Sequence, residues 1–415
     1  MGSKILVVSA IIPPEPSGSG LRALRHARHY DGRKRLGFLV TETQIGPAGE
    51  EFEKIRVVRL PRPCNRRGRE EVRYGKVQEC VREALDLVRC AFAWMRIFFF
   101  RTEKDTVLHC FGIDKSAFFC VLLGNLTGRK TVLEYTVLPD RAGRPGFLRL
   151  LNPNRAMKHY AVKRATRIAA ISPAIADHCR SMGIPDERIR LIPNGTDLER
   201  FTPAAAPEKE KLRSDLGYSG DDLLIINVGG FTLRKGIDIT LAAFLALQQD
   251  FPRLHLLVVG TNNLGVHKES RKAVYEPLVA RGLDESRVHC LGRVPDVERI
   301  MRAADLMLFP SRREGFPNVV IEAMACGVPV VARLLPGCTD YILEDGKAGV
   351  LVDSNDSGHF ADVCRALLIS AEARSSMGAA ARESVNSRFS NGAVYDLYDK
   401  LYGFPAGTRE FSGAV

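Results

Sequence analysis

Several features are missing from this 415-residue sequence, and each absence excludes a class of protein. Its ten cysteines form no Cys-x-x-Cys pair or other zinc spacing, which argues for reduced thiols in a cytosol and against a disulfide framework or zinc site. An apolar stretch at residues 91–100 is interrupted by Arg96 and is far shorter than the ~20 residues of a membrane span. No basic segment followed by a hydrophobic one opens the sequence, and Gly2 lacks the Ser or Thr at position 6 of a myristoylation signal. We expect a cytoplasmic protein that is soluble or, at most, peripheral at the cytoplasmic membrane face.

Acidic residues are scarce in two strongly basic segments. Residues 141–176 contain eight Lys or Arg and no Asp or Glu, and residues 56–76 contain eight opposed only by Glu70 and Glu71, within a net charge of +12. Such runs are usually solvated faces. The alternative is a positive field that attracts a phospholipid surface, a phosphate-bearing acceptor or nucleic acid. Nucleic acid is not predicted, because zinc-finger, RRM and KH patterns are missing and aromatic residues interleave poorly with the charges.

The most informative stretch is residues 314–332, which read EGFPNVVIEAMACGVPVVA. The β-branched run at residues 328–332 predicts a buried parallel strand, and the ten residues before it predict a helix. Pro317 is tolerated in the first turn of a helix, and Gly327 is typical of a helix end. Together with the apolar residues 306–310, the pattern predicts a strand, a loop, a helix and a second strand.

Two carboxylates flank this loop and helix. Glu322 lies five residues beyond Pro317, roughly 7.5 Å along a helix axis, and helical side chains lean back toward the N-terminus, where free N–H groups carry partial positive charge. This geometry suits a nucleotide sugar, with its diphosphate at the helix start, its ribose diol on Glu322 and its sugar hydroxyls on Glu314. The alternative is an ordinary helix start with two solvated glutamates. The loop residues expected around the ligand are Gly315, Phe316, Pro317 and Asn318.

The whole string closely resembles the signature of the retaining, nucleotide-sugar-dependent glycosyltransferases of family 4, which have the GT-B fold and are glycogen-synthase-like. Other matching segments occur in the expected order at residues 192–197, 228–230, 234–236, 258–260 and 291–294. The resemblance is strong over residues 189–352 and weak before them. It implies transfer of a hexose-type sugar to an acceptor hydroxyl with retention of the anomeric configuration. It leaves open an anionic, lipid-linked or small-molecule acceptor.

Strands and helices alternate along the chain, which predicts an α/β protein with doubly wound parallel sheets. The resemblance divides the chain into two Rossmann-like domains that face each other across a cleft. We expect an acceptor-binding domain at residues 1–195 and a nucleotide-sugar-binding domain at residues 208–388, with a helix at about 390–403 packing back on the first. A long helix or helix pair is predicted at residues 77–100, where Trp94, Met95 and residues 98–100 are interpreted as core rather than as a membrane wedge.

Catalysis requires the negative charge that develops on the leaving diphosphate to be stabilised. Preorganised cations and amide dipoles can provide this stabilisation, and no nucleophilic side chain is needed. Lys235 follows a strand and a turn and opens a helix, so its ammonium group is expected to grip the diphosphate; a surface helix start is the alternative. Relatives usually have Arg where this sequence has Gly230, and Arg234 is the expected replacement. No Asp-x-Asp metal clamp is present, so we predict no metal and no cofactor beyond the donor. Arg293, in the matching segment 291–294, is a further candidate.

The first half offers weaker candidates. Gly18 and Gly20 lie in a loop after the first predicted strand, where relatives touch donor phosphate or acceptor; a plain loop after proline is the alternative. Many relatives have Thr-x-His where this sequence has Glu134-Tyr135-Thr136. His109 ends the neighbouring strand and is a candidate for contact with the ligand, although a lone His there is more often a core residue.

Two other functions compete with glycosyl transfer. Two Rossmann-like halves also suit an NAD-dependent oxidoreductase, but Gly18-Ser19-Gly20 lacks the third glycine of the dinucleotide motif, which falls at Ala23. A non-catalytic anion-binding protein would use the basic segments, yet it has no need of Glu314, Lys235 and Glu322 together. The site rather than the fold distinguishes these hypotheses.

Overall fold

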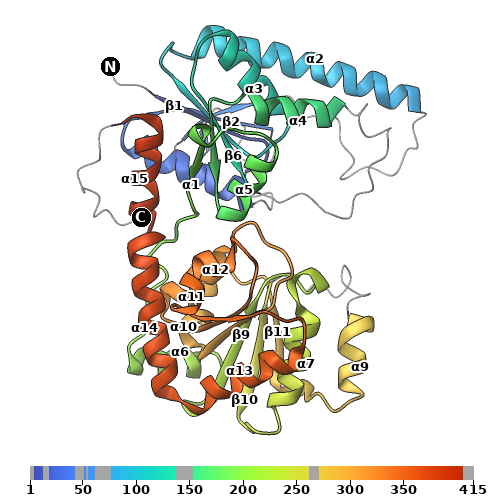
Figure 1. Cartoon of the computed structure of the whole chain (residues 1–415), viewed down its shortest axis with the longest axis vertical. Coiled ribbons are helices and arrows are strands. Elements are labelled where there is room, and N and C mark those ends of the chain that lie inside the picture. Colours follow the sequence, from blue (N-terminus) through green and yellow to red (C-terminus); the bar gives the residue numbers. More distant parts are fainter. Residues whose placement is uncertain are drawn as a thin grey trace. The chain divides into compact units, whose positions relative to one another are not determined.

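The computed structural model describes residues 4–12, 18–42, 51–52, 55–60, 76–136, 153–260 and 271–404. These residues form two compact units. The first unit falls within Met1–Ile171, Ile175–Leu191 and Leu401–Phe404, and the second within Ser172–Ala174 and Ile192–Lys400. Figure 1 shows that each unit has strands at its centre and helices around them.

The first unit is built on a sheet with the strand order β3-β4-β2-β1-β5-β6-β7-β8. All neighbouring strands pair in parallel except β3 and β4. In chain order its elements are β1 (Ile5–Ser9), α1 (Gly18–Gly32), β2 (Leu36–Thr41), β3 (Glu51–Phe52), β4 (Ile55–Arg59), α2 (Lys76–Arg101), β5 (Val107–Phe111), α3 (Lys115–Leu126), β6 (Thr131–Tyr135), α4 (Pro153–Arg164), β7 (Arg167–Ala170), α5 (Pro173–Ser181), the 3-10 turn η2 (Asp186–Arg188) and β8 (Ile189–Leu191).

The second unit is built on a fully parallel sheet with the order β11-β10-β9-β12-β13-β14. Its elements are α6 (Ala206–Asp215), β9 (Leu223–Val228), η3 (Leu233–Lys235), α7 (Ile237–Leu247), β10 (Leu254–Val259), the π-helical η4 (Arg271–Tyr275), α9 (Glu276–Val279), η5 (Glu285–Arg287), β11 (Val288–Gly292), α10 (Val297–Ala303), β12 (Leu306–Phe309), α11 (Asn318–Ala325), β13 (Val330–Arg333), α12 (Thr339–Ile342), η6 (Glu344–Gly346), β14 (Val350–Val352), α13 (Ser357–Ile369), α14 (Ala371–Arg388) and α15 (Asn391–Tyr402). The last two residues of α15 belong to the first unit.

The central strands of both sheets are buried on both faces, which explains why these strands are continuous apolar runs rather than alternating patterns. All five residues of β1 and all four of β12 are buried. In the second unit the core lies between the sheet and the helices α7 and α13, where Phe244 and Phe360 pack into one cluster with the strand residues. The expected fold class, two Rossmann-like units with parallel sheets, is confirmed.

The strands predicted at residues 306–310 and 328–332 are observed as β12 and β13 with ends shifted by one or two residues, and α2 matches the helix predicted at residues 77–100. Three helices were not predicted: α3, α6 and the short α12. The sequence pattern also predicts a helix at residues 270–281, and the structure has the π-helical η4 followed directly by α9 there; residues 261–270 lie outside the described residues. Within the described ranges, no helix is both long and apolar enough to cross a membrane.

The interpretation of residues 94–100 as core is only partly correct. Trp94 and Phe98 are buried, but Phe99 is 74% exposed and Met95 is half-buried. Successive helical residues point in directions about 100° apart, so a run of apolar residues cannot all face one sheet. The side chain of Phe100 lies outside the described residues.

Candidate functional site

The strand order of the second sheet identifies where a ligand is expected. The chain leaves β9 toward β10 on one side and leaves β12 toward β13 on the other, so the order reverses between these two adjacent strands. Loops that diverge from such a switch point leave a crevice beyond the carboxyl ends of the strands, which is the usual ligand site of doubly wound sheets. The loop after β9 leads to Lys235, and the loop after β12 leads to Glu314.

Lys235 and Glu314 meet at this point. The Lys235 Nζ atom lies 2.8 Å from Glu314 Oε1, and both side chains are largely shielded from solvent. The more exposed guanidinium of Arg234 lies 3.5 Å from the same carboxylate oxygen and donates to the carbonyl of Arg313 at 3.1 Å. Two cations and one carboxylate therefore share the switch point, an arrangement that can hold an anion next to a group that accepts hydrogen bonds.

Polar contacts that sequence reasoning missed fix the two loops to each other. Ser311 donates its hydroxyl proton to Glu314 Oε1 at 2.6 Å, and the Arg312 N–H donates to the Arg234 carbonyl at 2.9 Å. Arg312 also forms two hydrogen bonds of 2.7 Å to the two carboxylate oxygens of Asp238. Burial would raise the pKa of Asp238, but these bonds and the charge of Arg312 outweigh it and lower the pKa. The only sequence signal was the location of Ser311 directly after a buried strand.

Gly236 allows the loop after β9 to pass close to the loop after β12. Its φ angle is +74°, and a Cβ atom added there would lie 2.2 Å from the Pro310 carbonyl oxygen. Only glycine combines this left-handed conformation with such a close approach. Thr232 begins the turn by accepting a hydrogen bond from the Lys235 N–H, which fixes where the lysine side chain starts.

We expect Gly236→Ala to destabilise the second unit by about 1–3 kcal/mol, because the added methyl group must displace the Pro310 backbone as well as adopt a strained φ. The matched control is Gly217→Ala, since Gly217 also has a positive φ of +85° but open space around its Cβ position. Urea unfolding of both variants measures the difference. Equal destabilisation by the two substitutions would show that the approach to Pro310 contributes nothing.

The loop between β12 and α11 is anchored by its apolar residues. Phe316 is buried against the ring of Phe389, with centroids 5.7 Å apart, and Pro317 is buried beside it. Cys338 donates a weak hydrogen bond from Sγ to the Gly315 carbonyl at 3.7 Å, and Asn194 donates to Asn318 Oδ1 at 2.6 Å. Phe316 and Pro317 therefore shape the loop, while Gly315 and Asn318 remain partly exposed at the start of α11.

Glu322 occupies a different environment from Glu314. It is half-buried in α11, and its charge acts on Arg200 and Cys326. Arg200 is bonded to Glu298 at 2.7 Å, and that bond is the main reason why its pKa is raised. Glu314 belongs to the cluster of Lys235 and Ser311 in the loop after β12, whereas Glu322 lies within α11, where its charge helps to raise the pKa of Arg200.

The remaining predicted residues are not brought into this cluster by the described contacts. Gly230 is partly exposed, in the loop after β9, and Arg293 is exposed directly after β11, two strands away from β9. In the first unit, Gly18 is the first residue of α1. Gly20 is buried, and a Cβ there would lie 1.9 Å from the Ile11 carbonyl oxygen, so glycine is needed for packing.

His109 is a core residue in this structure, which contradicts its candidacy as a ligand contact. It is fully buried on β5, its Nδ1 lies 2.5 Å from the hydroxyl of Tyr402, and its ring stacks on Phe111 at 4.3 Å. Burial, and after it the charge of Arg22, lowers the pKa of His109 to about 3. A neutral imidazole without exposed surface has no access to a ligand.

The first unit has a buried ion pair that the sequence did not reveal. At the carboxyl end of β6, Glu134 Oε1 lies 2.7 Å from Arg22 Nη1, and the glutamate side chain is 1% exposed. Among the described residues, neither carboxylate oxygen of Glu134 receives a hydrogen bond of good geometry. Burial raises the pKa of Glu134, and Arg22 opposes this shift. Arg22, which retains some exposed surface, is thus held at the carboxyl edge of the first sheet.

The chain has two Rossmann-like units with parallel sheets, and the second carries two cations and a carboxylate at its switch point. Together these features place it in the GT-B class. Two family models together match most of the chain. The description "Glycosyl transferases group 1" matches residues 208–384, and "Glycosyl transferase 4-like domain" matches residues 17–195. The chain belongs to this family of GT4-like glycosyltransferases.

Among curated proteins, the chain is similar to enzymes named D-inositol 3-phosphate glycosyltransferase. The one from Corynebacterium jeikeium is 35% identical over 53% of each chain, and the one from Xylanimonas cellulosilytica is 34% identical over 56% of each. The N-acetyl-alpha-D-glucosaminyl L-malate synthase of Bacillus anthracis is 26% identical over 59% of this chain and 61% of its own. The matched region thus spans a little more than half the length of these relatives.

Solved structures with the same fold cover nearly the whole chain. Anabaena HepE in complex with UDP superposes with a TM-score of 0.74 and 20% identity, over 96% of this chain and 98% of that one. The sucrose-phosphate synthase of Thermosynechococcus elongatus has a TM-score of 0.72 and 20% identity, over 97% of this chain and all of its own, 100%. At this identity the likeness establishes the fold alone.

Proposed function

We propose that this protein is a retaining glycosyltransferase that moves a hexose from a nucleoside diphosphate to an acceptor hydroxyl without a divalent metal. The observation that carries the proposal is the Lys235–Glu314 pair, 2.8 Å apart at the switch point of the second sheet. A cation and a hydrogen-bond acceptor side by side suit the junction between a diphosphate and a sugar, because one holds phosphate oxygens and the other holds hydroxyls.

The chemistry follows from where charge develops. As the bond from the anomeric carbon to the diphosphate breaks, negative charge builds on the leaving oxygen. Lys235 and Arg234 lie where they can stabilise that charge, together with free N–H groups at the start of α11. The acceptor oxygen then forms the new bond to the anomeric carbon from the same face, and its proton passes to the departing diphosphate. Retention of configuration results.

The two acids are assigned to the two ends of the donor. Glu314 accepts hydrogen bonds from the transferred sugar, and Glu322 accepts them from the ribose diol. The positions of Glu314 beside Lys235 in the loop and of Glu322 further along, within α11, support this assignment, since a nucleotide sugar is an extended molecule with a sugar at either end of its diphosphate. One crystal structure of Anabaena HepE is a complex with UDP-glucose, which favours a UDP-sugar as donor.

We propose an anionic acceptor, such as a phosphorylated polyol. The names of the relatives include an inositol phosphate and a malate, both of which are anionic. The partly exposed Arg22, at the carboxyl edge of the first sheet, offers a guanidinium for such a group.

A thermal-shift screen of UDP-, GDP- and ADP-sugars, with NAD tested separately as a comparison ligand, tests the donor site. We expect one nucleotide diphosphate sugar to raise the melting temperature in the presence of EDTA, and we expect Glu322→Ala to remove the shift. Glu210→Ala, at an exposed position on α6, is the matched control and should leave the shift unchanged. Product formed from the stabilising donor and inositol phosphate, examined by NMR, should carry the donor's anomeric configuration.

Stabilisation by NAD with all sugar nucleotides inert would favour the oxidoreductase hypothesis. Loss of the shift on adding EDTA would contradict the metal-free mechanism. An inverted anomeric configuration in the product would contradict retention while leaving the donor site intact.

A further inference from the structure

Helix α2 of the first unit is apolar on two opposite faces. Cys90, Trp94, Ile97 and Phe98 are buried and form the face toward the core. Four exposed apolar side chains, which we call the α2 stripe, lie on the other face: Leu85 at 52%, Val88 at 52%, Phe92 at 63% and Phe99 at 74% exposure. Because successive helical residues turn by about 100°, the α2 stripe spans an arc of about 60° and runs about 21 Å along the helix. Such a row is unlike the single exposed apolar residues that occur on any surface.

Exposed arginines border the α2 stripe. Arg89 and Arg96 are seven residues apart, so they lie on one flank of the helix, next to Phe92 and Phe99. An aromatic and aliphatic face with arginines at its edge is the pattern of helices that lie in the interface of an anionic membrane. The helix does not resemble a membrane span, because its other face is buried in the protein.

A basic pocket lies at the edge of the sheet where α2 ends. Helices α2, α3 and α4 each end just before the strands β5, β6 and β7 begin, so their C-terminal ends share the amino edge of the sheet. Phe99 and the exposed Leu126 lie in the last turns of α2 and α3. The pocket of about 540 Å³ is found at the same edge, opposite the edge where ligands of parallel sheets bind.

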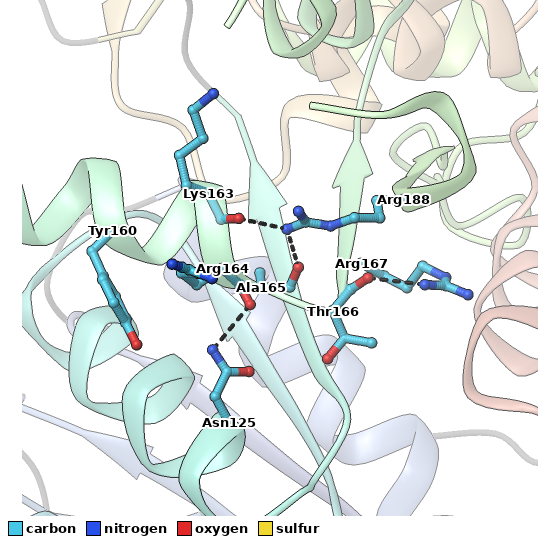
Figure 2. A pocket seen from close by; sticks show the side chains of 8 residues that line it. All are labelled: Asn125, Tyr160, Lys163, Arg164, Ala165, Thr166, Arg167 and Arg188. Atoms are coloured by element: carbon cyan, nitrogen blue, oxygen red, sulfur yellow. Dashed lines mark hydrogen bonds between the residues drawn. The ribbon is translucent and has the colours of Figure 1, made fainter. Parts of the chain in front are cut away.

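The pocket gathers positive charge. Four basic residues line it, Lys163, Arg164, Arg167 and Arg188, and none of its described lining residues is acidic. Figure 2 shows the Arg188 guanidinium directed at the end of α4, where it donates to the carbonyls of Lys163, at 3.0 Å, and Ala165. Burial lowers the pKa of Arg188, Arg167 and Arg164 lower it further, and the charge of Glu187, which is not among the lining residues, opposes them. Asn125 and Thr166 add polar groups to the lining. A phosphate group would relieve this repulsion.

We propose that the first unit docks on an anionic phospholipid surface through the α2 stripe, with a lipid phosphate held in the basic pocket. The α2 stripe would bury apolar surface in the membrane interface, and the arginines of α2 and of the pocket would attract the negatively charged lipids. An anionic bilayer matches both features. Its acyl chains can bury the α2 stripe, and its lipid phosphates, in the adjacent headgroup layer, can enter the basic pocket. A second copy of this chain would carry the same arginines, so pairing two such faces would bring like charges together.

Co-sedimentation with vesicles tests the proposal. We expect the full-length protein to bind vesicles of phosphatidylcholine with phosphatidylglycerol, to bind phosphatidylcholine alone much more weakly, and to dissociate partly at high salt. The double substitution Phe92→Ser with Phe99→Ser should weaken partitioning by at least about tenfold. Arg164→Gln with Arg167→Gln should weaken it about fivefold for each charge removed. Donor-induced thermal shifts should stay unchanged in both variants, since neither contacts the donor site.

Ile369→Ser is the matched control, because Ile369 is 71% exposed but belongs to α13 of the second unit. Its vesicle binding should equal that of the unchanged protein. Failure of the unchanged protein to bind anionic vesicles at low salt overturns the proposal. So does stabilisation by inorganic phosphate through Arg164 and Arg167 without vesicle binding, which would assign the pocket to a soluble phosphate. A dimer that the double Phe substitution dissociates, with vesicle binding unaffected, would assign the stripe to a second copy.

Discussion

Replacing Lys235 with alanine is expected to reduce kcat/KM for glycosyl transfer by about 10²–10³-fold, the loss typical of removing one group that stabilises transition-state charge. The ammonium group lies 2.8 Å from Glu314 in a largely shielded position, so water cannot easily replace it. Its stem packs against Gly229, where an added Cβ would be 3.2 Å from Lys235 Cδ. Steady-state kinetics with the donor identified by thermal shift measure the effect.

Three further variants separate the effect of charge from that of structure. Lys235→Arg keeps a cation and should retain more activity than Lys235→Ala, whereas Lys211→Ala, at an exposed position on α6, should have no effect. Arg234→Ala should reduce kcat/KM less than Lys235→Ala, because the Arg234 side chain is 49% exposed and its Nη1 atom lies 3.5 Å from Glu314 Oε1. A Lys235→Ala enzyme with activity within threefold of the original would exclude Lys235 from the stabilisation of the leaving group.

Replacing Asp305 with asparagine is expected to destabilise the second unit by about 3–5 kcal/mol, the cost of leaving a buried charge without its partner. Asp305 lies just before β12, with a side chain that is 7% exposed, and its Oδ2 lies 2.6 Å from Arg213 Nη2. The same carboxylate receives Lys209 Nζ at 3.0 Å and the Leu224 N–H at 2.9 Å. Asp305 therefore connects α6 to the central strands β9 and β12 of the second sheet.

The effect should depend on pH. Burial tends to raise the pKa of Asp305, but Lys209, Arg213 and the Leu224 N–H outweigh it, so the pKa is lowered from 3.8. A carboxyl whose folded-state pKa is lowered contributes stability above its unfolded pKa and loses it as the pH falls through the folded value. Burial lowers the pKa of Lys209 in spite of Asp305. Both Lys209 and Arg213 stabilise the ionised carboxylate of Asp305.

Urea unfolding at neutral pH and below pH 3.8 gives the free energy of unfolding at each pH and so tests both predictions. The gap between the original protein and Asp305→Asn should be largest at neutral pH and should narrow in acid. Asp221→Asn is the control, because Asp221 is 83% exposed and pairs with Arg253 at 3.1 Å in solvent, where an ion pair contributes little. A gap that stayed constant with pH would show that the charge of Asp305 is not the cause.

Local sequence patterns predicted the parts of the fold that repeat along the chain. Buried strands such as β9 and β12 are continuous apolar runs, and α11 is marked at both ends by Pro317 and Gly327, so their positions followed from the residues themselves. Helix α3 was missed because it is apolar almost all round, with Phe119, Cys120 and Val121 buried, and such a helix has no amphipathic period. Its N-terminal signal was present in Asp114, which accepts from the Ala117 N–H at 2.9 Å.

The candidate site was predictable to the extent that its residues follow strand ends. Lys235 and Glu314 were chosen for that reason, and the strand order brings β9 and β12 together. The bond from Ser311 to Glu314 and the pairing of Arg312 with Asp238 were not predictable. Arg312 and Asp238 are 74 residues apart, and no spacing rule joins them.

The sequence alone determined the two-domain α/β class and the loops that carry the site, because strand burial, helix ends and the string from Glu314 to Ala332 are local properties. Only the tertiary structure decided which side chains are covered. It buried His109 in the core, exposed Phe92 and Phe99 on α2, and gathered Arg164, Arg167 and Arg188 around one pocket. The physical reason is that the exposure of a side chain depends on the elements packed against it, and those come from distant parts of the chain.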